Sequence, residues 1–173
     1  MSDEPGCVYV GCDPGVKGAV AAIYGEGQRA EAWYTPMLKS GYNLKGMLKL
    51  LYPFQKLKQA GWEVLVAIER QGGRPTDPKS TVFKVGRAQA LWEMAAVANG
   101  LPYELIAPVS WKCRYVPKGA TKQASITAAS AIYPDVPFPL KKSEALAEAI
   151  LIADFIMRKE LKLNYPYSRK RGQ

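Results

Sequence analysis

Two almost entirely apolar segments of this chain each end in a carboxylate. The first is CVYVGCD at 7–13, and the second is VLVAIE at 64–69. A continuous apolar run of this length is typical of a strand that is buried on both faces of a sheet. A carboxylate that closes such a strand loses its hydration unless a cation or hydrogen bonds replace the water. Asp13 and Glu69 therefore indicate a functional site at one edge of a central sheet, where α/β proteins gather their functional groups.

The remaining pattern predicts a mixed α/β sheet with helices on its faces. Apolar runs at 19–24 and 30–37, each reached through a tight turn, predict two strands that follow the first one in antiparallel order. Later strands alternate with helices, as expected for βα units. Pro53 should kink or shorten the first helix. We expect helices over 43–61, 83–99, 121–133 and 143–162, a strand over 102–108, and basic loops rich in Gly and Pro over 70–80 and 111–123.

Length and composition are those of an ordinary globular protein. With 173 residues and 48% hydrophobic residues, we expect one domain over 1–163 and a frayed basic tail over 164–173. The apolar runs are too short for a membrane span and the N-terminus lacks the form of a signal peptide, so we expect no membrane partner. Three cysteines without a CxxC spacing predict reduced thiols. These features favour a reducing cytoplasm, either bacterial or of a phage-infected cell, with an organelle as the alternative.

The charge balance narrows the class of partner. Twenty-four Lys and Arg face fifteen Asp and Glu, which gives a net charge of +9. A surplus of this size favours a polyanion, usually a nucleic acid, although a merely basic protein is the alternative. The chain has no His. Ser-His-Asp catalysis, His acid–base chemistry and His metal ligands are therefore excluded.

The last predicted helix carries two further acids on one face. Glu144 and Glu148 are spaced i,i+4, and Leu151 and Phe155 continue the same face. Two like charges at this spacing destabilise an isolated helix by about 0.2–0.5 kcal/mol. Their presence therefore favours a function, although acids near a helix N-terminus also interact favourably with the helix dipole.

Together the acids predict a metal centre. If the last helix packs beside the two strand ends, Asp13, Glu69, Glu144 and Glu148 form one cluster, which cannot remain fully ionised unaided. Oxygen ligands alone select Mg²⁺ or Mn²⁺. Two such ions per site are the usual device for in-line displacement at phosphorus. A basic protein with a carboxylate-only metal site indicates a nuclease.

Several segments carry a family resemblance. VGCDPGVKGAVAAI, VLVAIE, the region 83–123 and SEALAEAILIAD resemble, in this order, segments of RuvC-like Holliday junction resolvases of the RNase H-like superfamily. The similarity covers most of residues 8–157 and is nearest to the phage and organellar members. It implies an RNase H-like mixed five-stranded sheet, with three antiparallel strands followed by βα units and helices on both faces.

The resemblance also implies a mechanism and an assembly. Asp13, Glu69, Glu144 and Glu148 match the metal-binding acids of the family, although Glu144 stands where many relatives have Asp. A homodimer would cut opposite strands of a four-way junction symmetrically. The central helix offers a dimer surface, or its apolar residues simply pack on the sheet. These residues are Val85, Ala88, Leu91, Trp92 and Ala95.

Basic residues in the two predicted loops are candidates for phosphate contacts, because their spacing fits no single helical face. They are Arg70, Arg74, Lys79, Lys112, Arg114, Lys118 and Lys122. Either Lys112 or Lys118 also qualifies as a catalytic residue that stabilises the pentavalent phosphorane. Trp111 and Tyr115 either stack on an unpaired base or anchor their loop in the core.

Three other functions stay open at this point. A junction-binding architectural protein with weak or lost catalysis would share the fold and the charge. Another nuclease of the RNase H fold would act on branched DNA or an RNA–DNA hybrid, whereas a transposase would need additional domains. A kinase-like nucleotide-binding domain is suggested by the turn at 13–15 but lacks a second phosphate-binding half.

Overall fold

The sheet is mixed and five-stranded. The computed structural model describes residues 5–15, 17–27, 29–72, 76–136 and 144–166. Within them, β1 (Cys7–Asp13), β2 (Ala19–Tyr24) and β3 (Arg29–Tyr34) form an antiparallel meander. β6 (Glu63–Glu69) and β7 (Tyr103–Ile106) run parallel to β1, and the strand order is β3-β2-β1-β6-β7. The predicted five-stranded RNase H-like sheet is therefore confirmed.

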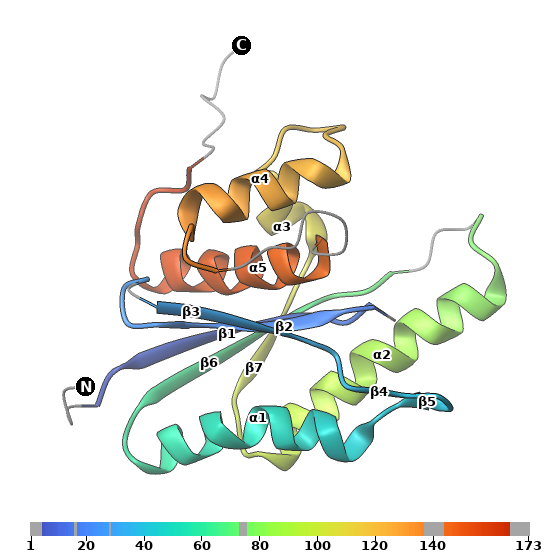
Figure 1. The fold of residues 1–173 in the computed structure, drawn as a ribbon, viewed down its shortest axis with the longest axis horizontal. Helices are drawn as coiled ribbons and strands as arrows, with labels where there is room; N and C mark the ends of the chain where they lie inside the picture. Colours follow the sequence, from blue (N-terminus) through green and yellow to red (C-terminus); the bar gives the residue numbers. More distant parts are fainter. Residues whose placement is uncertain (1–4, 16, 28, 73–75, 137–143, 167–173) are drawn as a thin grey trace.

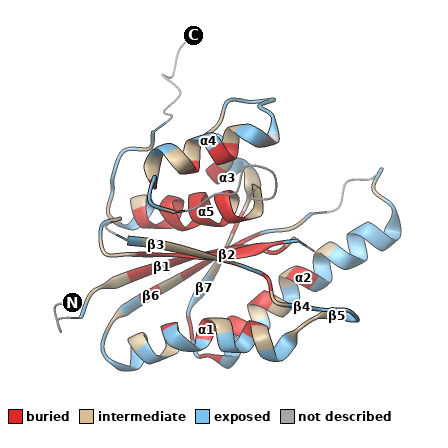
Figure 2. Ribbon diagram, viewed as in Figure 1, coloured by how far each residue is buried: buried red, intermediate tan, exposed pale blue. Residues whose placement is uncertain are grey.

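Helices cover both faces of this sheet (Figure 1). α1 (Leu44–Gln59) and α2 (Lys79–Ala98) lie on one face. The opposite face is covered by α3 (Pro108–Lys112), α4 (Lys122–Ile132) and α5 (Glu144–Glu160). Each face has its own hydrophobic core, and α5 is the most thoroughly buried helix in Figure 2. None of the helices in the described ranges is both long and apolar enough to cross a bilayer.

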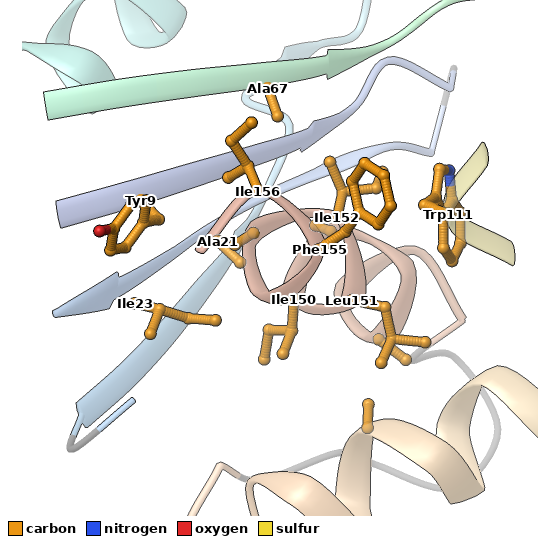
Figure 3. Packing of buried hydrophobic residues seen from close by; sticks show 14 of the residues in the cluster. Tyr9, Ala21, Ile23, Ala67, Trp111, Ile150, Leu151, Ile152, Phe155 and Ile156 are labelled. Atoms are coloured by element: carbon orange, nitrogen blue, oxygen red, sulfur yellow. The ribbon is translucent and has the colours of Figure 1, made fainter. Parts of the chain in front are cut away.

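The close packing of α5 on β1 depends on a glycine. A β-carbon at Gly11 would overlap the carbonyl oxygen of Ala149 and the backbone nitrogen of Ala153. Only glycine allows two backbones to approach this closely. Figure 3 shows the isoleucines of α5, among them Ile152 and Ile156, packed beneath the strands. The first turns of α5 are thereby held near the end of β1.

The first helix does not respond to its proline as predicted. α1 continues from Leu44 through Pro53 to Gln59. Pro53 is exposed, and so is Lys49, whose carbonyl loses its helical hydrogen bond to the proline. Met47, Leu51 and Phe54 are buried on the other side, and their packing stabilises the helix through the proline.

Other boundaries also differ from the predictions. β3 ends at Tyr34, and a small hairpin of β4 (Met37–Leu38) and β5 (Gly41–Tyr42) follows it. α2 begins at Lys79. β7 ends at Ile106, and α3 spans the end of the predicted strand and the start of the predicted loop, with Pro108 at its first position. The short elements were missed because two to five residues carry no periodicity.

The face of α2 that the sequence offered as a dimer surface packs on the sheet. Trp92 and Ala95 are buried in the core of this face, and Ala88 is also fully buried. The alternative interpretation is therefore correct for these three residues. The opposite side of α2 is exposed, as the pale ribbon in Figure 2 shows.

Candidate active site

Two of the predicted acids meet at one edge of the sheet. β1 and β6 are parallel and in register, with Cys12 paired to Ile68. Asp13 and Glu69 each follow directly after this pair, so the two strand ends carry adjacent carboxylates. Glu148 joins them from the second turn of α5.

The charges of these acids are close enough to affect one another. Burial raises the pKa of Asp13 to about 7, and the carboxylates of Glu69 and Glu148 contribute to the rise. The backbone N–H of Gly15 donates to Asp13 Oδ1 over 3.2 Å and acts in the opposite direction. A single hydrogen bond replaces little of the lost hydration. The charged form of Asp13 is therefore disfavoured, and a bound cation would stabilise it.

Glu69 is held through both of its oxygens. Trp111 Nε1 donates to Oε1 over 3.0 Å, and Gln71 Nε2 donates to Oε2 over 2.9 Å. Burial raises the pKa of Glu69, and these two donors together with Lys112 oppose the rise. Trp111 is fully buried, so it has no free face for a nucleobase and the stacking interpretation is wrong.

A chain of hydrogen bonds extends from Glu69 to α2. The backbone N–H of Gln71 donates to Gln89 Oε1 over 2.7 Å, and Gln89 Nε2 donates to Glu93 Oε1 over 2.6 Å. Tyr103 donates its hydroxyl to the other oxygen of Glu93 over 3.0 Å. Sequence analysis missed this chain, for which the i,i+4 spacing of Gln89 and Glu93 was the available signal.

Lys112 lies among the acids. Its Nζ is 3.0 Å from Glu148 Oε1 and 3.3 Å from Oε2, and Ser125 Oγ donates to Oε1 over 3.4 Å. Burial opposes the charge of Lys112, yet Glu148, Glu69 and Asp13 together raise its pKa above the ordinary value. Lys112 is therefore a cation within the acid cluster, whereas the sequence had suggested phosphate contacts and a catalytic role toward the phosphorane.

The fourth predicted acid, Glu144, opens α5 one turn before Glu148 and shares its helical face. The segment 137–143, directly before Glu144, lies outside the described residues. The participation of Glu144 in the cluster stays a prediction.

Four of the other predicted DNA-binding residues lie at the surface. Arg70, Lys79, Arg114 and Lys118 are exposed. Arg74 lies outside the described residues, and Lys122 begins α4 with a side chain that is not described. An open cavity of about 330 Å³ adjoins Lys112. It is lined by Val109, Lys112, Cys113, Val116, Pro117, Lys118, Gly119 and Ala120.

The donor atoms suit a hard divalent ion in kind. Carboxylate oxygens without His or Cys are the ligands of Mg²⁺ and Mn²⁺. Within the described ranges, however, no three acidic, His or Cys side chains are gathered tightly enough to form a metal-binding group. The ammonium of Lys112 supplies the positive charge beside Glu148 instead.

A second buried acid on α5 is structural. Asp154 is completely buried and accepts hydrogen bonds from the hydroxyls of Tyr115 and Tyr133, over 2.7 and 2.6 Å. Arg158 Nε also donates to it over 2.5 Å. These donors join α5 to α4 and to the turn after α3, so Tyr115 anchors its loop and does not stack on a base. Tyr165 stacks on Phe155, so the chain after α5 also packs against the helix as far as it is described.

Comparison with known proteins supports the fold. No protein-family model and no curated protein matches the chain. A structure of Thermus thermophilus RuvC matches with a TM-score of 0.57 and 19% identity, over 92% of this chain and 99% of that one. T. thermophilus RuvC in complex with a Holliday junction substrate matches with a TM-score of 0.59 at the same identity and coverage. The resemblance to RuvC-like resolvases that the sequence predicted is therefore confirmed at the level of the fold, and this chain has the RuvC fold.

Proposed function

We propose that this protein is a metal-dependent, structure-selective endonuclease that resolves four-way DNA junctions. One observation carries the proposal: carboxylates at the ends of β1 and β6 and on α5 lie near enough to one another to raise the pKa of Asp13, in a strongly basic protein. Structures with the same fold support it, because one of them is a RuvC in complex with a Holliday junction substrate.

Asp13, Glu69 and Glu148 would hold two Mg²⁺ or Mn²⁺ ions, with Glu144 as a fourth ligand. When bound, such ions activate water and stabilise the leaving oxygen of a phosphodiester. Trp111 and Gln71 fix the orientation of Glu69 through its two oxygens. Hydrogen-bonded partners of this kind are what position a metal-binding carboxylate.

The basic residues around the acids would bind phosphates of the junction. Lys112 and Lys118 line one cavity, and Lys112 also contacts Glu148, so these two lysines would neutralise the charge that develops on the reacting phosphate. Binding through such contacts weakens steeply as salt rises. The remaining candidates for this role are Arg70, Arg74, Lys79, Arg114 and Lys122.

We also propose a homodimer that forms through the exposed side of α2. Phe83, Met94 and Val97 are 70%, 61% and 55% exposed, which is unusual for large apolar side chains on one helix. With Arg87 and Ala90 they follow a 4-3-4-3 spacing, the pattern of a seam between two helices. A second copy docked on this seam would give the two active sites that symmetric cleavage requires.

Cleavage of synthetic substrates tests the function. Wild type and Asp13→Asn are each incubated with a four-way junction, a linear duplex and an RNA–DNA hybrid, with and without Mn²⁺. We expect wild type to cut the junction only with metal, and Asp13→Asn to bind the junction without cutting it. Junction binding without any cleavage would instead indicate an architectural protein, and preference for the hybrid would indicate a different nuclease.

A further inference from the structure

We propose that Lys112 is an internal cation of the acid cluster, which holds the carboxylates together before a divalent ion binds and must leave Glu148 when the ion takes its place. This inference rests on the proposed metal-dependent function and adds a regulation of the same site. It concerns a competition between two cations for one carboxylate.

The contacts of Lys112 support the role. Its Nζ contacts both oxygens of Glu148, at 3.0 and 3.3 Å, and this carboxylate also accepts a longer hydrogen bond from Ser125 Oγ, at 3.4 Å. The same Nζ lies 5.1 Å from the ring centre of Trp111, whose indole N–H is bonded to Glu69. The ammonium is therefore positioned between the acid on α5 and the acid on β6.

The surroundings make this more than an ordinary surface ion pair. The side chain of Glu148 is only 12% exposed, whereas that of Lys112 is 40% exposed. Losing the partner would leave Glu148 beside two other acids in a poorly hydrated place, which is costly. A divalent ion would compensate the same charges, so the two cations exclude each other at this carboxylate.

The side chain of Lys112 also has space to move away from Glu148. Lys112 ends α3, and it lines the open cavity of about 330 Å³ as well as contacting Glu148. A change of rotamer would move the ammonium toward Lys118 on the same cavity wall, where the two cations would attract a phosphate. Release from Glu148 would thus convert Lys112 from a counter-ion into a phosphate-binding residue.

The ion pair and metal binding are thermodynamically coupled, and this coupling can be measured. If the ion pair opposes metal binding, removing the ammonium must tighten metal binding, and metal must weaken the ion pair by the same factor. Couplings of this kind commonly amount to factors of about 5–150. A lysine that merely supports the fold, or that helps to build the metal site, would have no such effect.

The test measures Mn²⁺ binding to the full chain by isothermal titration calorimetry, without DNA. Lys112→Met removes the charge and keeps the length of the side chain, whereas Lys112→Arg keeps the charge. Lys118→Met is the matched control, because it removes an exposed lysine from the same cavity wall. We expect Lys112→Met to bind Mn²⁺ about tenfold more tightly than wild type, and Lys112→Arg and Lys118→Met to stay close to it.

Thermal unfolding provides a second readout. Lys112→Met should melt at a lower temperature than wild type without metal, and Mn²⁺ should raise its melting temperature by more. If this variant does not fold without metal, the ¹⁵Nζ resonance of Lys112 in wild type, identified by its absence from Lys112→Arg, should shift as Mg²⁺ is added.

The outcomes separate this inference from the proposed function. Equal or weaker Mn²⁺ binding by Lys112→Met, or an unchanged Nζ resonance at saturating Mg²⁺, would overturn the role of Lys112 while wild-type binding still supported a metal site. Binding by Lys112→Met alone would support the competition and contradict a metal-dependent wild-type enzyme. Absence of binding in both proteins would overturn both proposals.

Discussion

Two buried acids of α5 differ in how they are neutralised. Asp154 accepts two tyrosine hydroxyls and an arginine, and it is completely buried. Glu148 lies less than two turns away, beside two other carboxylates and a single half-exposed lysine. The fold therefore surrounds Asp154 with three hydrogen-bond donors, whereas Glu148 has the ammonium of Lys112 and a longer contact from Ser125 Oγ. This contrast separates a structural carboxylate from one that is available for binding.

The largest effect on activity is expected from Asp13→Asn. The change removes a charge from the acid cluster, so junction cleavage in Mn²⁺ should fall by at least about a thousandfold, corresponding to roughly 4 kcal/mol of lost transition-state stabilisation. Junction binding in a mobility-shift assay should change little, because the phosphate contacts remain. Normal cleavage by this variant would remove Asp13 from the site.

Asp154→Ala should lower the stability of the protein and leave Mn²⁺ binding unchanged. It leaves Arg158 and the hydroxyls of Tyr115 and Tyr133 without their acceptor, which should lower the free energy of unfolding by about 3–5 kcal/mol. Chemical denaturation measures this loss, and calorimetry on the folded fraction should give an unchanged affinity for Mn²⁺. A weaker affinity at full folding would contradict the division between the two acids.

A charge on the exposed seam of α2 should separate the copies. Met94→Glu introduces a carboxylate where we propose that two helices meet, and a loss of 2 kcal/mol or more would weaken dimerisation by at least about thirtyfold. Sedimentation velocity measures the shift to monomer. Lys49→Glu, which alters charge at an exposed position of α1, is the control. If Met94→Glu stays dimeric, or if the wild-type protein is already a monomer, the proposed dimer contact through α2 is wrong.

The raised pKa of Asp13 should make the free energy of unfolding depend on pH. The pKa of Asp13 is raised to about 7 from an ordinary value near 3.8. Between these values the folded protein keeps a proton that the unfolded chain has lost, so the free energy of unfolding contributed by this group decreases as pH rises from about 4 to about 7. Denaturation of the metal-free protein along this range should show the decrease, and Asp13→Asn should reduce it. An identical slope in the two proteins would mean that Asp13 titrates normally.

The smallest effect is expected from the hydrogen-bond chain to α2. Gln71→Leu removes one of the two donors to Glu69, which should raise the Mn²⁺ concentration for half-maximal cleavage severalfold, as for a lost bond worth about 1 kcal/mol. Tyr103→Phe removes the outermost bond of the chain and should leave this concentration unchanged. Equal effects of the two changes would contradict a specific role for the donor nearest to Glu69.

The sequence predicts the sheet and two of its acids well because both depend on local patterns. Apolar runs of strand length identified β1 and β6, and the acids that close them lie side by side as expected. The pairing of Lys112 with Glu148 and the bond from Trp111 to Glu69 were not predictable, since they join residues 36 and 42 positions apart. Lys112 looked like a DNA contact because only tertiary packing brings α3 beside α5.

A crystal structure grown with Mn²⁺ tests the central claim most directly. Anomalous scattering locates the ion independently of the protein atoms. The account predicts strong peaks between the carboxylates of Asp13, Glu69 and Glu148, with Lys112 Nζ withdrawn from Glu148. Saturating Mn²⁺ with no peak at these side chains, and with the Lys112–Glu148 pair intact, would contradict it.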